Sequence, residues 1–379
     1  MKTKNKSVII FTIISISFLS GMIFVEYELY PYSSIKSSLV TNDIPQNVSF
    51  YEKNDVSKLI HVTDMSQLNK LRSDVNTFLW NQQQLPSELP SYVEINHSDS
   101  RYAELKNLDS IDMFSIDMEN GVNSIQYLFK PIDANNKLII YHQGHKGDFI
   151  EGKQIIQHFL ENKFTVLASS MPLLGMNSQP IIEHPNFGTF KLTSHNQLKF
   201  LESDNFSTMK FFIHPIILAL NHLSIEENFE SVHMIGISGG GWTTTLVSAI
   251  DDRIDQSFSV AGSYPIFLRT DPKNFGDYEQ TNPDFYKITN YLDLYIMAAS
   301  GSDRKHIQIF NKYDPCCFDG DNFLIYEADV KKIVNEINNN DSFMIFLDDT
   351  HNEHKISEHA LGIIDNEINN FQKLDILKP

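Results

Sequence analysis

The segment that most restricts how this chain can fold is an apolar run that leads directly into a glycine-rich turn around a serine. It reads Val-His-Met-Ile-Gly-Ile-Ser-Gly-Gly-Gly-Trp over residues 232–242 and contains Gly-x-Ser-x-Gly at Gly236, Ser238 and Gly240. The apolar run predicts a strand, and the small residues after it predict a helix. On so sharp a strand-to-helix turn the serine has a strained backbone, and Cβ atoms on its neighbours would collide. The pattern therefore predicts that Ser238 presents its hydroxyl above a sheet as a nucleophile.

Short apolar runs alternate with helical patterns over much of the chain. Six runs predict strands, at residues 137–141, 164–168, 232–237, 258–261, 307–310 and 343–347. Helix-like stretches occur at residues 152–162, 207–221, 241–249 and 329–338. This alternation is typical of a parallel sheet with right-handed crossovers. We therefore predict an α/β fold with helices on both faces of a mostly parallel central sheet.

An antiparallel hairpin is predicted in front of the parallel region. Residues 112–117 and 124–129 have the composition of strands, and they flank Asn120-Gly121, the pair that type I′ turns prefer. Further upstream, apolar residues at steps of three and four predict a helix over residues 65–80.

Two long segments without a clear period follow strands, at residues 170–204 and 264–296. Because ligands bind at the carboxyl ends of the strands in open α/β sheets, we expect these loops to lie above the site. The two segments are expected to shape the pocket. The aromatic residues in or just after them suit acyl chains, sugars or core packing equally well: Phe187, Phe190, Phe206, Tyr264, Phe267, Phe275, Tyr278 and Phe285.

At the serine motif the chain resembles the α/β-hydrolase superfamily. The resemblance covers roughly residues 110–375, and its most specific element is the strand, Gly-x-Ser-x-Gly turn and helix around Ser238. It implies the α/β-hydrolase fold and a catalytic triad in the chain order serine, acid, histidine. It also implies an oxyanion hole formed by the amide that follows the nucleophile, here that of Gly239, and by a loop after an earlier strand.

The segment after the predicted strand 138–141 looks like the superfamily's His-Gly oxyanion loop. It reads His-Gln-Gly-His-Lys-Gly over residues 142–147, and Gln143 is extra relative to the simplest form. The second oxyanion donor implied by the resemblance is thus the amide of Gly144 or that of His145, and the choice stays open.

Asp314 matches the acid of the superfamily, because it follows the penultimate predicted strand by a few residues. Its implied role is to accept the Nδ1–H of the histidine, fix the tautomer and stabilise the imidazolium. Asp303 precedes that strand and Asp321 lies far into the loop, whereas Asp319 remains a nearby competitor.

Two histidines after the last predicted strand compete for the role of base. His354 is followed by Lys-Ile-Ser and a predicted helix, which looks like the superfamily's usual ending, and His351 lies closer to the strand. A neutral imidazole with a pKa near ~6.5 is the usual base for a serine hydroxyl. We assign the base to His354 and keep His351 as the alternative.

Together these residues predict a serine hydrolase that cleaves a small-molecule, saccharide or lipid acyl ester through a Ser-His-Asp triad and an acyl-enzyme. An acyltransferase or a peptidase would use the same groups. The alternative outside the enzymes is a hydrolase-like binding module that does not turn over a substrate. Fluorophosphonate labelling that requires Ser238 would reject the binding module.

Charge and motif content exclude other classes. The 379 residues include 30 Lys and Arg and 48 Asp and Glu, a formal net charge of −18, and no basic run supplies the footprint of a nucleic-acid binder. No His-Glu-x-x-His, EF-hand or Walker pattern occurs, so the linear motifs predict no metal and no cofactor. The two cysteines, Cys316 and Cys317, are adjacent and cannot join distant segments, so we interpret them as two partly buried thiols in a loop.

The N-terminus has the pattern of a membrane-targeting segment. Three lysines precede the uncharged residues 7–25, and two glutamates follow. The stretch is nearly as long as the ~20 residues of a spanning helix, and the charge asymmetry places the N-terminus in the cytoplasm. No clean small-x-small cleavage site follows, so we predict an uncleaved signal anchor with the catalytic domain on the non-cytoplasmic side. A cleaved signal peptide and a secreted protein are the alternative.

The predicted domain organisation follows from these features. Residues 1–26 are the signal anchor or signal peptide, 27–55 a stalk, 56–110 a helical extension and 111–379 the α/β-hydrolase domain.

Overall fold

The computed structural model describes residues 55–338 and 340–371. The predicted signal anchor and nearly all of the predicted stalk therefore lie outside the described residues. Within the described part, no helix combines the length and the apolar character needed to cross a bilayer.

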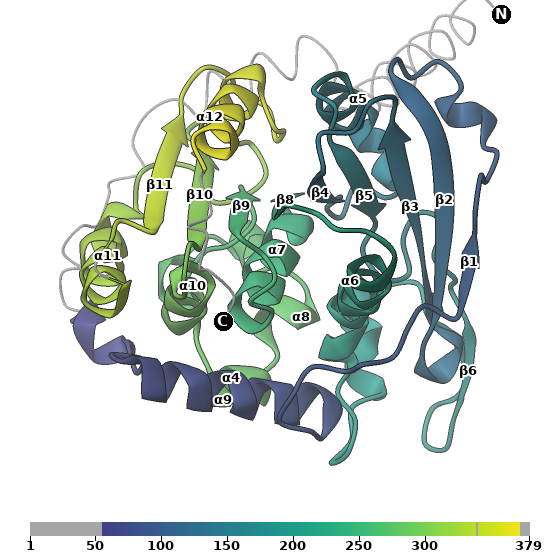
Figure 1. Cartoon of the computed structure of the whole chain (residues 1–379). Helices are drawn as coiled ribbons and strands as arrows, with labels where there is room; N and C mark the ends of the chain where they lie inside the picture. The colour runs from purple at the N-terminus through teal and green to yellow at the C-terminus, as the bar shows by residue number, and fades with distance from the viewer. Residues whose placement is uncertain (1–54, 339, 372–379) are drawn as a thin grey trace, which may run out of the picture. The chain divides into compact units, whose positions relative to one another are not determined.

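The centre of the fold is a mixed sheet, which in the described residues has nine strands in the order β1-β2-β3-β5-β4-β8-β9-β10-β11 (Figure 1). The strands are β1 Tyr92–Glu94, β2 Leu108–Asp117, β3 Asn123–Pro131, β4 Lys137–His142, β5 Thr165–Ser169, β8 Ser231–Ile237, β9 Gln256–Val260, β10 Lys305–Asn311 and β11 Phe343–Asp348. Neighbours from β5 to β11 pair in parallel, whereas β1, β2 and β3 pair antiparallel and β3 joins β5 antiparallel. The predicted mixed sheet is confirmed.

Helices cover both faces of this sheet (Figure 1). One face carries α5 Lys153–Glu161 and α12 Glu358–Asn369, whose apolar side chains share a core cluster with the strands. The other carries α6 His214–Glu226, α7 Gly239–Ile250, α10 Tyr291–Ala299 and α11 Leu324–Asn338. Every residue of β5 and β9 is buried, as expected for parallel strands with helices above and below them.

Local patterns locate several elements correctly. Helix α4 spans Met65–Trp80, with the Asp64 side chain accepting the Gln67 N–H at its start. The turn between β2 and β3 has positive φ at both Asn120 and Gly121, 60° and 72°, as a type I′ turn requires.

The two long segments are more ordered than the sequence predicts. The first holds the β6 Ile181–His184 and β7 Gly188–Lys191 pair and the 3₁₀ helix η5 His195–Phe200. The second holds α8 Tyr278–Thr281 and α9 Phe285–Ile288 and runs into α10. The prediction of one loop over residues 264–296 is therefore wrong. Every residue of α10 is buried, so that helix lacks the polar face that produces a helical period in a sequence.

Candidate active site

Ser238 lies on the sharp turn between β8 and α7. Its backbone has φ 57° and ψ −127°, a strained conformation for a residue with a side chain. A Cβ added at Gly236 would lie 2.1 Å from the Gly240 carbonyl oxygen, and one added at Gly240 would lie 2.1 Å from that of His142. A side chain at either position would therefore clash, and Gly240 in particular allows the turn to pack against the end of β4.

Asp314 is buried in the loop after β10, and both of its carboxylate oxygens have partners. Oδ2 lies 2.7 Å from Nδ1 of His354. Oδ1 accepts the backbone N–H groups of Cys316 and Cys317 at 2.8 and 3.1 Å. Because these two amides hold one oxygen, the other is directed at the imidazole.

His354 presents its second ring nitrogen to the same space as Ser238. Its Nε2 is buried and has no hydrogen-bond partner among the described residues. Both residues line one pocket of about 440 Å³. Among the described residues, no hydrogen bond joins Ser238 Oγ to His354 Nε2. In enzymes without bound substrate, the distance between nucleophile and base often exceeds hydrogen-bond length.

The competing residues are directed elsewhere. His351 Nε2 lies 3.3 Å from Asp348 Oδ2 at the end of β11, and its Nδ1 accepts the Glu353 N–H at 3.1 Å. Asp319 lies 3.7 Å from Lys273 Nζ. Neither His351 nor Asp319 lines the pocket that contains Ser238.

The loop after β4 packs against the serine turn. A Cβ added at Gly144 would lie 2.7 Å from Ser238 Cβ, so this loop approaches the turn at its backbone. The Gln143 N–H donates to Ser169 O at 2.9 Å, which leaves the amides of Gly144 and His145 as the candidates on this loop. Gly239 begins α7, where the first amides of a helix have no partner within the helix.

Comparison with solved structures assigns this arrangement of strands and helices to a known fold. No protein-family model matches the chain, and no curated protein matches it. An acetyl xylan esterase from Paenibacillus sp. R4 superposes with a TM-score of 0.55 at 14% identity, covering 84% of this chain and 98% of that one. Acetyl xylan esterase 1 from Thermoanaerobacterium sp. JW/SL YS485 gives 0.54 at 13% identity, covering 86% and 98%. A putative acetyl xylan esterase from Bacteroides fragilis gives 0.54 at 14%, covering 81% and 82%. The chain has the α/β-hydrolase fold.

The pocket beside Ser238 combines an apolar lining, which includes Tyr141, Ile155 and Ile237, with several polar side chains. The polar ones come from the loop after β4, from the 3₁₀ helix η4 Phe149–Gly152, from the start of α5 and from the segment after His354: Gln143, Lys146, Glu151, Gln154 and Lys355. The sequence pointed to Gln143 only as an insertion. It carried no signal for Glu151 or Gln154, because only the packing of η4 and α5 against the sheet brings them to the pocket.

The expectation that the two long segments shape the pocket beside Ser238 is wrong, because no residue of either segment lines it. None of the eight aromatic residues named from the two long segments lines the pocket beside Ser238. Tyr264 and Phe285 are buried in the core, where Tyr264 stacks on Phe318 with ring centroids 5.3 Å apart. These side chains support the loops from within.

The two cysteines are joined to each other by a disulfide, so the interpretation as two partly buried thiols is wrong. Cys316 is exposed and contributes to the pocket lining. Cys316 and Cys317 bind Asp314 through their backbone N–H groups, which every residue except proline would also provide.

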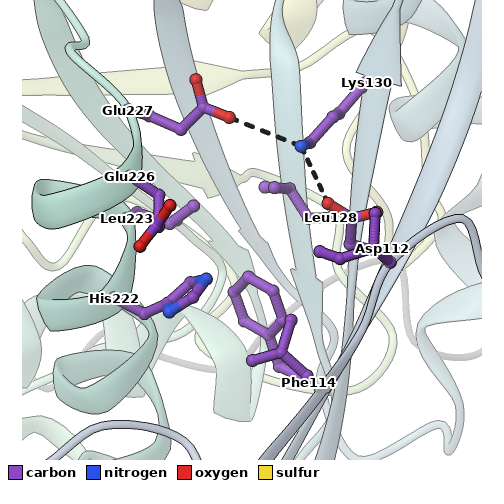
Figure 2. A pocket seen from close by; sticks show the side chains of 10 residues that line it. Asp112, Phe114, Leu128, Lys130, His222, Leu223, Glu226 and Glu227 are labelled. Carbon is purple, nitrogen blue, oxygen red and sulfur yellow. Dashed lines mark ion pairs between the residues drawn. The ribbon is translucent and has the colours of Figure 1, made fainter.

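A second pocket in this protein, of about 370 Å³, lies between strands β2 and β3 and helix α6 (Figure 2). Lys130 Nζ lies 2.8 Å from Asp112 Oδ2 and 3.4 Å from Glu227 Oε1, so its charge is paired. None of the described residues that line this pocket is a serine, threonine or cysteine. It therefore lacks a hydroxyl or thiol nucleophile, and the pocket with Ser238 remains the candidate active site.

Proposed function

We propose that this protein is a serine esterase that hydrolyses short acyl esters, with an acetylated saccharide as the substrate class. The observation that carries the proposal is the Asp314–His354 pair at 2.7 Å, which opens onto the pocket that also contains Ser238. This is the arrangement of acid, base and nucleophile that acyl transfer to a serine requires.

In the proposed reaction, Ser238 Oγ attacks the ester carbonyl carbon while His354 Nε2 takes its proton. The oxyanion accepts hydrogen bonds from the Gly239 amide and from that of Gly144 or His145. The tetrahedral intermediate collapses as His354 protonates the leaving alcohol oxygen, which leaves an acyl-enzyme. Water then attacks with His354 as base, and the carboxylic acid and Ser238 are released.

The substrate class is inferred from the pocket lining. Gln143 and Gln154 offer amide donors and acceptors, while Lys146, Glu151 and Lys355 add charged groups that suit sugar hydroxyls. The structural neighbours named as acetyl xylan esterases support the same choice.

The test is a panel of substrates with the purified protein. We expect kcat/KM to fall from p-nitrophenyl acetate to butyrate to octanoate, and acetate to be released from acetylated xylo-oligosaccharides. Preference for octanoate would favour a lipid ester instead. Turnover that needs an added alcohol or amine acceptor would indicate an acyltransferase, and cleavage of peptides a peptidase. Failure of both turnover and fluorophosphonate labelling would leave a binding module.

Replacing Asp314 by asparagine is expected to lower kcat about 10⁴-fold with a near-normal melting temperature. The amide can still accept the Cys316 and Cys317 N–H groups, but its NH₂ would donate to His354 Nδ1 and select the wrong tautomer. The matched control is Asp319→Asn, which makes the same chemical change five residues away and should stay within tenfold. An active Asp314→Asn enzyme with an inactive Asp319→Asn enzyme would move the acid to Asp319.

For the N-terminus we propose that residues 7–25 stay attached as a membrane anchor and that the esterase domain faces the non-cytoplasmic side. The support is the length of the uncharged stretch and the absence of a clear cleavage site. Intact mass and N-terminal sequencing of the protein recovered from membranes should give the uncleaved chain. A mature N-terminus near residues 25–35 would instead make the protein a secreted one.

A further inference from the structure

Four ionisable side chains from three separate segments meet beside the oxyanion loop. His145 belongs to the loop after β4, and His195 opens η5 in the first long segment. Asp277 immediately precedes α8 in the second long segment, and Glu279 lies within it. Each side chain offers one nitrogen or oxygen atom, and these four atoms all lie within 4.8 Å of one another. We call this group the His145 cluster.

The distances in the His145 cluster match a shared cation better than a set of direct hydrogen bonds. His145 Nε2 lies 3.0 Å from Glu279 Oε1 and 3.4 Å from Asp277 Oδ2. His195 Nδ1 lies 3.5 Å from Glu279 Oε1 and 3.6 Å from Asp277 Oδ2. Only the first is a good N–H···O distance. Tetrahedral zinc with ligands at about 2.0–2.1 Å places its ligand atoms about 3.3–3.4 Å apart, a value that the four separations of 3.0 to 3.6 Å bracket.

Two buried atoms of the cluster have no hydrogen bond. Glu279 is fully buried at 0% exposure; its Oε1 faces the two histidines, and its Oε2 has no hydrogen-bond partner among the described residues, so a bound cation could be held by both oxygens of this carboxylate. His195 is 3% exposed, and its Nδ1 likewise has none in the described part of the chain. Buried polar atoms without partners are costly and uncommon, so the cluster calls for a further group. One cation between the four side chains would satisfy the ring nitrogen and balance both carboxylates.

The orientation of His195 points the same way. Its Nε2 lies 2.8 Å from the Pro172 carbonyl oxygen. A carbonyl only accepts, so Nε2 carries the hydrogen, and a neutral ring then directs the lone pair of Nδ1 at two carboxylates. Histidine ligands to metals commonly donate their other ring N–H to a backbone carbonyl in this way.

A proton on His195 is the competing source of positive charge. Burial is the largest influence and disfavours the imidazolium, but Glu279, the Pro172 carbonyl and Asp277 together raise the pKa of His195 above its usual value. An imidazolium at this position would pair with the same two carboxylates as a metal ion. The geometry above is what distinguishes them, since an imidazolium would shorten its contacts to hydrogen-bond distance.

We propose that the His145 cluster is a structural zinc site. Two imidazole nitrogens and two carboxylate oxygens form a ligand set suited to zinc, and four protein ligands leave no open position for a substrate. The ion would join the oxyanion loop to both long segments. A Cβ added at Gly239 would lie 2.4 Å from His145 Cε1, so His145 also contacts the serine turn. Zinc would thereby hold the oxyanion loop in place against Ser238 without taking part in the reaction.

Linear motifs do not reveal such a site, because its ligands are spread over 134 positions of the chain. The first test is the zinc content of the full-length protein, purified in detergent, treated with EDTA and then dialysed against micromolar zinc. We expect one zinc per chain by plasma mass spectrometry and a melting temperature several degrees above that of the EDTA-treated protein.

The variants His195→Ala and Glu279→Gln are each expected to lose the zinc. The matched control is His158→Ala, which removes a histidine whose Nε2 lies 2.9 Å from Asp365 Oδ2 outside the cluster. It should retain one zinc per chain. If either ligand variant fails to fold, the absorption spectrum of the cobalt-loaded wild type replaces it, and tetrahedral d–d bands without a thiolate charge-transfer band are expected.

Three results would overturn the proposal. Wild-type chain free of zinc after dialysis would mean that a proton on His195 holds the cluster together. Zinc retained by both ligand variants would place the ion outside the His145 cluster, and a thiolate band with cobalt would place it at His354 with Cys316 and Cys317 after reduction of their disulfide. None of these readouts depends on ester hydrolysis, so the zinc site and the proposed function stand or fall separately.

Discussion

Ser238→Ala is expected to lower kcat toward acetyl esters by about 10⁶-fold, the size of effect seen when a triad nucleophile is removed. The hydroxyl is the only part of the side chain that is lost. Alanine and serine both carry a Cβ, so the strained backbone at φ 57° has the same steric environment and the turn should persist. We therefore expect a melting temperature within a few degrees of wild type. Kinetics and thermal melts of the same preparations measure both effects.

Labelling provides the independent check on the nucleophile. A fluorophosphonate probe should label the wild-type protein once, on the peptide that contains Ser238, and should not label the alanine variant. Ser178→Ala serves as the control, because Ser178 is a half-buried serine outside the pocket whose hydroxyl donates to the Gly121 carbonyl. Labelling that survives in Ser238→Ala would show that a different residue is the nucleophile.

His354→Ala is expected to lower kcat about as much as loss of the serine, by roughly 10⁶-fold, because the two act as a unit. His351→Ala should cost tenfold or less. His351 contacts Asp348 at 3.3 Å, whereas His354 contacts the buried Asp314 at 2.7 Å and lines the pocket with Ser238. The comparison requires kcat for both variants, with circular dichroism to establish that each is folded.

The pair of histidine variants is its own control, because the residues lie three positions apart and the change is identical. An inactive His351→Ala protein together with an active His354→Ala protein would reverse the assignment. Loss of activity in both, with normal folding, would mean that the Asp348–His351 contact also holds the loop that carries His354.

The serine turn was predictable because its determinants are contiguous. Steric exclusion of Cβ at Gly236 and Gly240, an apolar strand before and small residues after are all local to the turn. Helix α4 over Met65–Trp80 and the hairpin turn at Asn120 were predictable for the same reason. The polar groups around Ser238 were not predictable in this way, and the expectation that the two long segments shape the pocket is the clearest error.

Short-range sterics and hydrophobic period act between residues a few positions apart, so the amino-acid sequence by itself determined the serine turn and the strand–helix alternation. The candidates Asp314, His354 and His351 came from the resemblance of the sequence to the α/β-hydrolase superfamily. Tertiary packing decided how those candidates are directed, with His354 toward Asp314 and His351 toward Asp348. It also decided that α10 is a buried helix, that Glu151 and Gln154 reach the pocket, and that His145, His195, Asp277 and Glu279 meet. Such convergence depends on how separate elements pack across the whole sheet, and no local pattern encodes the distance between side chains that are remote in the chain.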